Sequence, residues 1–413
     1  MRESFRPERM AVSGRGGRGR LALLCGLAAL LVGAVVVPPT PATAAPVCGP
    51  TGETLPPGTP WALSRLEPSA AWRITRGEGV TVAVIDSGVS ATHPLLRGQV
   101  LPGADFNNLP SIQGQCDLAG HGTIVAGIIA GKEGTGKAFT GIAPAAEILP
   151  VRVLPDAKTR TDEGLPAQIA QAIIWAVDQG ADVLNLSLVT LPRPELESAI
   201  EYALDKDVVV VAAAGNRQEQ QQNLPAYPAA YPGVIAVAGV DEQGGHVDSS
   251  VVGDYVDIAA PGLNIVGPAP RGQGYRAEPQ GGTSFAAAYV SGAAALVRAA
   301  YPDLSPAQVA YRLTRTADNP PDGRNAELGY GVVNPYRAVT SLLGTRDDPP
   351  PGAMPAPPPQ QDPLAWQRTV AVWAAVIGAA LAGLLLATRP ILARGRSRGW
   401  RPGRRPAETG PTG

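Results

Sequence analysis

Short, mostly apolar runs alternate with segments of helical periodicity over much of this chain. Each run is five to seven residues long, which suits a buried strand better than a buried helix. The segments 166–180, 195–206 and 304–317 instead have apolar residues at helical spacing. Strands that alternate with helices predict a parallel sheet covered on both faces, and so an α/β domain. The predicted strands are residues 81–85, 148–154, 182–188, 208–214, 234–240 and 256–260.

Three polar residues stand next to these elements in a suggestive order. Asp86 ends the first predicted strand, and functional residues of such sheets gather at the C-terminal ends of strands. His121 begins the helix-like run after Gly120, and Ser284 begins another after Thr283. A serine is a poor nucleophile unless a histidine takes its proton, and a carboxylate must hold the imidazole in the right tautomer. The three residues therefore predict the acid, base and nucleophile of a serine hydrolase.

Each of these residues alone has an ordinary structural interpretation. An aspartate after a strand often forms a turn, a histidine before a glycine is often structural, and a serine here often caps a helix. Asn216 adds a fourth element, because it follows a predicted strand and its amide, with the Ser284 N–H, would stabilise an oxyanion. Gly281 and Gly282 are expected to leave room for a peptide beside the nucleophile. The combination favours catalysis.

The motifs resemble those of the subtilisin family of serine peptidases, which has the same order of acid, base and nucleophile. The resemblance covers residues 72–338 and includes VIDSGV, HGTIVAGIIAG, GIAP, LNLSL, AAAGN, YPGVIAVAGV, IAAPG and GTSFAAAYVSGAAAL. It implies a three-layer α/β/α domain with a mostly parallel sheet, and peptide-bond hydrolysis through an acyl-enzyme on Ser284. An inactive member that only binds peptides is a weaker alternative, because no catalytic residue is missing.

The resemblance also implies a substrate cleft. Its edge, usually Ser-Leu-Gly in the family, is Ser187-Leu188-Val189 here. Ala226 stands where a glycine often forms the pocket floor, and Gly215 is assigned to the same cleft. The added side chains of Val189 and Ala226 favour small or slim substrate side chains before the scissile bond.

The N-terminal residues predict export from the cytoplasm. Arginines precede an apolar run at 21–37, and a small-residue cleavage site follows at 42–44. Residues 1–44 are therefore predicted to be a signal peptide, with an uncleaved membrane anchor as the alternative. An N-terminal extension at 45–70 and the peptidase domain at 71–343 are expected to follow.

Two cysteines, Cys48 and Cys116, remain after the predicted cleavage. Outside the cytoplasm they favour one disulfide, although two free thiols are an alternative. The bridge would close a loop of 68 residues and stabilise the fold by roughly 4 kcal/mol in the chain-entropy model. The loop after the His121 helix offers Glu133 but no cluster of carboxylates, so no calcium, other metal or cofactor is expected.

The C-terminal part of the chain is predicted to anchor the domain to a membrane. Prolines make residues 344–365 a semi-rigid extended linker. Residues 366–388 predict a transmembrane helix, because residues 369–387 are uncharged and long enough to cross a bilayer, although a buried helix is the alternative. Arginines crowd residues 389–413, which are predicted to be a cytoplasmic tail and so place the domain outside the cytoplasm.

Charge argues against a nucleic-acid partner. The chain has 34 basic and 35 acidic residues, and the segments before residue 21 and after residue 388 together hold 13 of the basic residues but only three of the acidic ones. The intervening domain is consequently acidic, unlike a face that binds phosphates.

This order of signal, cysteine, domain, proline-rich linker, span and basic tail resembles the mycosins, the membrane-anchored subtilases of actinobacterial type VII secretion. It implies an endopeptidase at the cell membrane, acting on protein or peptide substrates, with the secretion membrane complex as a partner. Only about forty residues separate Ala45 from Asp86, so no separate folded prodomain is expected. The alternative function is a structural subunit of that complex in which proteolysis is secondary.

Overall fold

The computed structural model describes residues 48–55, 58–107, 113–133, 139–155, 163–217, 224–343, 365–397 and 399–400. Contacts divide the chain into residues 1–46 and 47–413, and the first unit lies wholly outside the described residues. The predicted signal peptide at 1–44 and all but the last residue of the predicted linker at 344–365 lie outside them too, as does the tail after residue 400.

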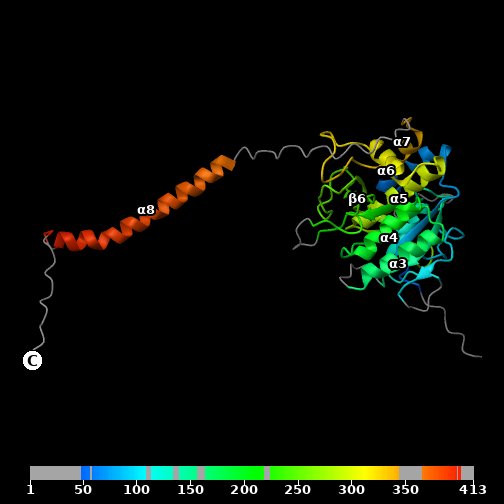
Figure 1. Cartoon of the computed structure of the whole chain (residues 1–413), viewed down its shortest axis with the longest axis horizontal. Helices are drawn as coiled ribbons and strands as arrows, with labels where there is room; N and C mark the ends of the chain where they lie inside the picture. The colour runs from blue at the N-terminus through cyan, green and yellow to red at the C-terminus, as the bar shows by residue number, and fades with distance from the viewer. Residues whose placement is uncertain are drawn as a thin grey trace, which may run out of the picture. The chain divides into compact units, whose positions relative to one another are not determined.

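A seven-stranded sheet forms the centre of the domain (Figure 1). All its strand pairs are parallel, and the strand order is β2-β3-β1-β4-β5-β6-β7. Each of the six predicted runs overlaps one of these strands, whereas the two-residue β2 is too short for any sequence pattern to mark it. The strands are β1 Thr81–Asp86, β2 Ala104–Asp105, β3 Glu147–Arg152, β4 Val183–Leu186, β5 Val209–Ala213, β6 Ile235–Val240 and β7 Ile258–Pro261.

Helices cover both faces of this sheet, and each face of the sheet has its own hydrophobic core. Val82 and Val84 of β1 lie in one core, and Ala83 and Ile85 lie in the other, as the twofold alternation of a strand requires. This confirms the predicted three-layer α/β/α domain. The first core includes α2 (His121–Ala130), α5 (Thr283–Ala300), α6 (Pro306–Arg315) and α7 (Pro335–Thr340), and the second includes α3 (Leu165–Asp178) and α4 (Pro194–Asp205).

Residues 48–55 are attached to a two-stranded hairpin of β8 (Ile265–Pro268) and β9 (Tyr275–Glu278). Glu53 and Tyr275 exchange two backbone hydrogen bonds of 2.8 Å, and Cys48 forms a disulfide with Cys116. The next elements are α1 (Trp61–Leu66) and the 3-10 helix η1 (Pro68–Arg73), and Leu63 of α1 is buried in the first core. Much of the segment predicted to be an N-terminal extension is thus packed onto the domain.

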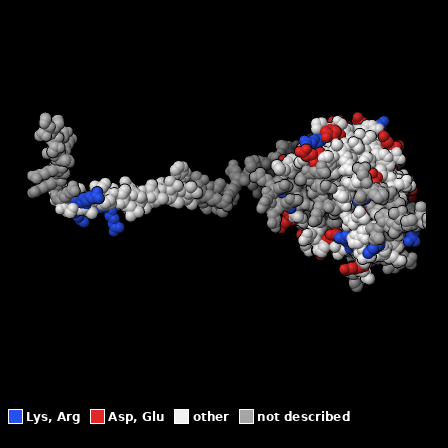
Figure 2. Space-filling model, turned by 90° about the horizontal axis from the view of Figure 1, so that it is seen from below, with Lys and Arg blue, Asp and Glu red and all other residues white. Residues whose placement is uncertain are grey.

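One further helix, α8 (Ala365–Ser397), carries the apolar segment predicted to cross a membrane. Within Val370–Ser397 an 18-residue window has a mean hydropathy of 2.4, and the length and composition of the helix suit a membrane span. Figure 2 shows α8 free of charged side chains over most of its described length, with basic side chains at one end. The helix continues past residue 388, the end of the predicted span, to Ser397 and includes Pro390.

The disulfide predicts a measurable loss of stability on its removal. Replacing both Cys48 and Cys116 by serine should lower the free energy of unfolding by roughly 4 kcal/mol, since the unfolded chain regains the entropy of an open loop. Denaturant unfolding of the variant and of the unreduced wild type measures the difference. Equal stability of the two proteins, or free labelling of both thiols in the native protein, would contradict the prediction.

Candidate active site

Asp86 and His121 meet at the C-terminal end of β1. The Nδ1 atom of His121 lies 2.8 and 3.0 Å from the two carboxylate oxygens of Asp86. The Asp86 side chain is fully buried, and that of His121 is only 14% exposed. Gly122 permits this approach, because a Cβ there would lie 2.2 Å from the carbonyl oxygen of Gly88. With its Nδ1 proton donated to Asp86, the imidazole has Nε2 available as a base.

The charges around His121 control its protonation. Burial alone lowers the pKa of His121, because it disfavours the charged imidazolium. The charge and hydrogen bond of Asp86 oppose burial, and the charges of Asp117 and Glu278 add to them. The net result is a pKa of His121 above its usual value of 6.5.

Ser284 and Asn216 lie together at the start of α5. The side-chain oxygen of Asn216 accepts hydrogen bonds from the N–H of Thr283 (3.0 Å) and from its hydroxyl (3.2 Å). This arrangement fixes the amide and leaves its NH2 group as a donor. The Ser284 hydroxyl donates to the carbonyl oxygen of Ser187 (3.2 Å). His121 borders the same helix, since its ring centroid lies 5.1 Å from that of Phe285.

A chain of buried hydrogen bonds supports the backbone at Ser284. Ser291 of α5 donates to the side-chain oxygen of Asn185 (2.9 Å), whose NH2 group donates to the hydroxyl of Ser187 (2.9 Å). That hydroxyl donates to the carbonyl oxygen of Ser284 (2.7 Å). Asn185 and Ser291 were not identified from the sequence. Two sequence features could have indicated them. Asn185 is a polar residue within an apolar run, and Ser291 is a serine in a helix rich in alanine.

The predicted substrate residues line one cleft of about 510 Å³. Ala226 forms part of its wall against Gly215, where an added Cβ would lie 2.8 Å from the Ala226 Cβ. The hydroxyl of Tyr255 accepts a hydrogen bond from the Ala226 N–H (3.3 Å) and donates to the Ala214 carbonyl (2.6 Å), which supports this wall. The cleft is lined by Ser187, Leu188, Val189, Gly215 and Ala226, together with Asn216 and Ser284.

The two glycines before Thr283 differ in what they do. Gly282 lies beside Asn216, where an added Cβ would be 3.4 Å from the amide nitrogen. Gly281 does not make room for a peptide, because an added Cβ there would lie 1.8 Å from the carbonyl oxygen of Gly262. Position 281 requires a glycine because its backbone packs directly against the backbone of Gly262. Within the described ranges, no group of three or more His, Cys, Asp or Glu side chains is placed to hold a metal ion.

Comparison with known proteins shows the family of this chain. The model of the subtilase family matches residues 77–331. Mycosin-3 of Mycobacterium tuberculosis is 36% identical over 402 residues, which cover 82% of this chain and 85% of that protein. The crystal structure of MycP1 with its N-terminal propeptide removed aligns with a TM-score of 0.64 at 34% identity, over 70% of this chain and 99% of the other. A chain of the intact ESX-5 inner membrane complex aligns with a TM-score of 0.64 at 32% identity, over 85% of this chain and 94% of the other.

The chain therefore belongs to the subtilase family, and it is a subtilisin-type serine endopeptidase. Within that family it is of the mycosin type, which confirms the resemblance predicted from the sequence.

The raised pKa of His121 predicts where activity is lost in acid. A protonated imidazole cannot accept the serine proton, so activity falls as the pH drops through this pKa, and raising the pKa moves that loss to higher pH. The rate of labelling by a serine-reactive fluorophosphonate should therefore have its acid limb above pH 6.5. Glu278→Gln should move the limb to lower pH, because it removes one of the negative charges that raise this pKa. A limb below pH 6.5 in the wild type would contradict this account.

Proposed function

We propose that this chain is a membrane-anchored endopeptidase that acts outside the cytoplasm through Asp86, His121 and Ser284. The observation that carries the proposal is the buried Asp86–His121 hydrogen bond, at 2.8 Å, at the same end of the sheet as the cleft that contains Ser284 and Asn216. Acid, base, nucleophile and oxyanion donor are all supplied by residues of the described domain.

In the proposed reaction, Ser284 attacks the carbonyl carbon of the scissile peptide bond. Its hydroxyl first leaves the Ser187 carbonyl, to which it is bonded in the free protein, and turns to Nε2 of His121. His121 takes the proton, and Asp86 stabilises the resulting imidazolium. His121 then returns the proton to the leaving amine, which gives the acyl-enzyme on Ser284. A water molecule, activated by the same imidazole, hydrolyses this ester.

The oxyanion of each tetrahedral intermediate requires donors that are already in place. The Asn216 NH2 group and the Ser284 N–H are proposed to supply them. The amide cannot rotate freely, because Thr283 holds its oxygen with two hydrogen bonds. Such fixed donors stabilise the developing charge without the cost of reorganisation during the reaction.

The shape of the cleft supports a preference for slim side chains before the scissile bond. Val189 and Ala226 both line it, and each adds carbon atoms where family members often have glycine. A larger substrate side chain would then have to displace wall atoms held by Tyr255. One methylene group in such a pocket changes discrimination by about 1–3 kcal/mol.

We also propose that the chain occupies a fixed place in a type VII secretion membrane complex. The match to a chain of the ESX-5 inner membrane complex supports this, since it extends over 94% of that chain. Helix α8 supplies a span, and Arg389, Arg394 and Arg396 near its C-terminal end favour the cytoplasmic side for the tail. A role as a structural subunit, with proteolysis secondary, is the second candidate function.

Removing the Ser284 hydroxyl separates the two candidates. Ser284→Ala deletes one oxygen atom and should leave the domain, linker and α8 intact. In a strain whose own copy is deleted, the variant should fail to cleave substrate but should restore the membrane complex and secretion. Native electrophoresis of the membrane complex and quantification of secreted proteins measure these outcomes. Equal loss of complex and secretion in the Ser284→Ala and deletion strains would overturn the structural role and leave proteolysis as the sole function.

A further inference from the structure

A third buried carboxylate, Asp117, lies beside the Asp86–His121 pair. It precedes His121 by four residues and is fully buried. Its carboxylate accepts five hydrogen bonds from the segments that carry the pair. The donors are the Ser87 hydroxyl (2.9 Å), the N–H groups of Ala119 (3.1 Å), Gly120 (2.7 Å) and Thr123 (2.8 Å), and the Thr123 hydroxyl (2.7 Å).

Asp117 connects the loop after β1 to the first turn of α2 by two routes. The first passes through Ser87, whose hydroxyl also accepts from the Gly122 N–H (3.0 Å) and whose own N–H donates to Asp86 (2.7 Å). The second passes through Thr123, whose hydroxyl accepts from the N–H of Ser90 (3.0 Å). Both routes join the loop that follows Asp86 to the helix that begins with His121, and the first route also reaches the Asp86 carboxylate.

The start of α2 needs such a carboxylate. The first N–H groups of a helix have no partner within the helix, and Gly120 at its N-cap has no side chain to offer one. Asp117 supplies the missing acceptor from outside the helix, and its negative charge suits the positive end of the helix dipole. The same charge contributes to the raised pKa of His121.

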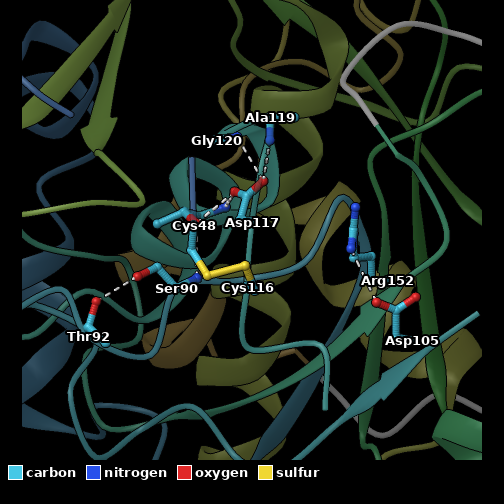
Figure 3. Close-up of a disulfide and its surroundings, with 10 residues drawn as sticks. Cys48, Ser90, Thr92, Asp105, Cys116, Asp117, Ala119, Gly120 and Arg152 are labelled. Atoms are coloured by element: carbon cyan, nitrogen blue, oxygen red, sulfur yellow. Dashed lines mark hydrogen bonds and ion pairs between the residues drawn. A yellow bond between two sulfur atoms is a disulfide. The ribbon is translucent and has the colours of Figure 1, made fainter. Parts of the chain in front are cut away.

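The Cys48–Cys116 disulfide restrains the backbone next to Asp117, because Cys116 directly precedes Asp117 in the chain. Figure 3 shows Asp117 next to the Cys48–Cys116 bridge, with interactions to Ala119 and Gly120. Gly49 packs directly on the backbone of Asp117, since an added Cβ would lie 2.2 Å from the Asp117 carbonyl oxygen. The N-terminal segment therefore packs against the backbone of Asp117, whose side chain is fully buried.

We propose that Asp117 is a positioning residue for peptide hydrolysis, which sets the separation of Asp86 and His121 through Ser87 and the first turn of α2. The inference rests on the proposed function. The charged groups that face His121 are Asp86, Asp117 and Glu278, and Arg276 lies nearby with hydrogen bonds to the Ala119 carbonyl (3.0 Å) and to Glu278 (3.0 Å). Changing Asp117 therefore alters both the geometry and the charge at His121.

The test uses the full chain and the pH dependence of fluorophosphonate labelling. Asp117→Asn keeps the shape but replaces one acceptor oxygen by a donor, which leaves without an acceptor either the Thr123 N–H or the N–H groups of Ala119 and Gly120. Labelling should slow on the order of 10- to 100-fold, the effect of a misplacement near 1 Å. Its acid limb should also move to lower pH, because a negative charge facing His121 is gone. Ser87→Ala keeps the charge, so it should slow labelling while leaving the limb in place.

Asp257→Asn is the matched control. Asp257 is a largely buried carboxylate that precedes β7, beside a separate cavity, and it accepts from the Ala236 N–H (3.0 Å). This control should leave the labelling rate and limb unchanged. The positioning role is overturned if Asp117→Asn and Ser87→Ala are labelled at the same rate as Asp257→Asn and if the acid limbs of their pH profiles lie where that of Asp257→Asn lies. If Asp117→Asn does not fold, the Ser87→Ala result decides. Labelling of Ser284→Ala at the wild-type rate would instead refute the proposed function itself.

Discussion

The hydrogen bond between Asp86 and His121 is the interaction on which the proposed mechanism depends. It requires a carboxylate to be buried at the end of a central strand and a helix to begin within 3 Å of it. Burial of an ionised carboxylate is costly unless hydrogen bonds and charge compensate for it. Here His121 and the N–H of Ser87 provide that compensation. The arrangement is also what keeps the pKa of the imidazole high.

The parallel sheet brings the remaining groups to the same place. Strands β1, β4 and β5 are neighbours, and Asp86, Ser187 and Asn216 lie at or just beyond their C-terminal ends. Residues far apart in the chain therefore meet at one edge, which parallel sheets favour as a ligand site. Helix α5 packs against the same strands and supplies Ser284 from its first turn.

The sequence predicted the sheet well because β1 and β3 to β7 are almost wholly buried, so each appears as an apolar run. It predicted Asp86, His121, Ser284 and Asn216 as a set because a nucleophilic serine needs partners of defined chemistry. It did not indicate Asp117, Asn185 or Ser291, since a polar residue in an apolar setting has no periodicity, and its partners are defined only by the fold. The contact of Gly281 with Gly262 could not be predicted either, because only the fold brings these two backbone segments together.

The most direct test of the account is the site of fluorophosphonate attachment, mapped by peptide mass spectrometry. The account predicts one modified residue, Ser284, in the wild-type chain, and loss of that modification in the folded His121→Ala variant, because the hydroxyl then has no base. Attachment at another residue, or undiminished modification of Ser284 without His121, would contradict it.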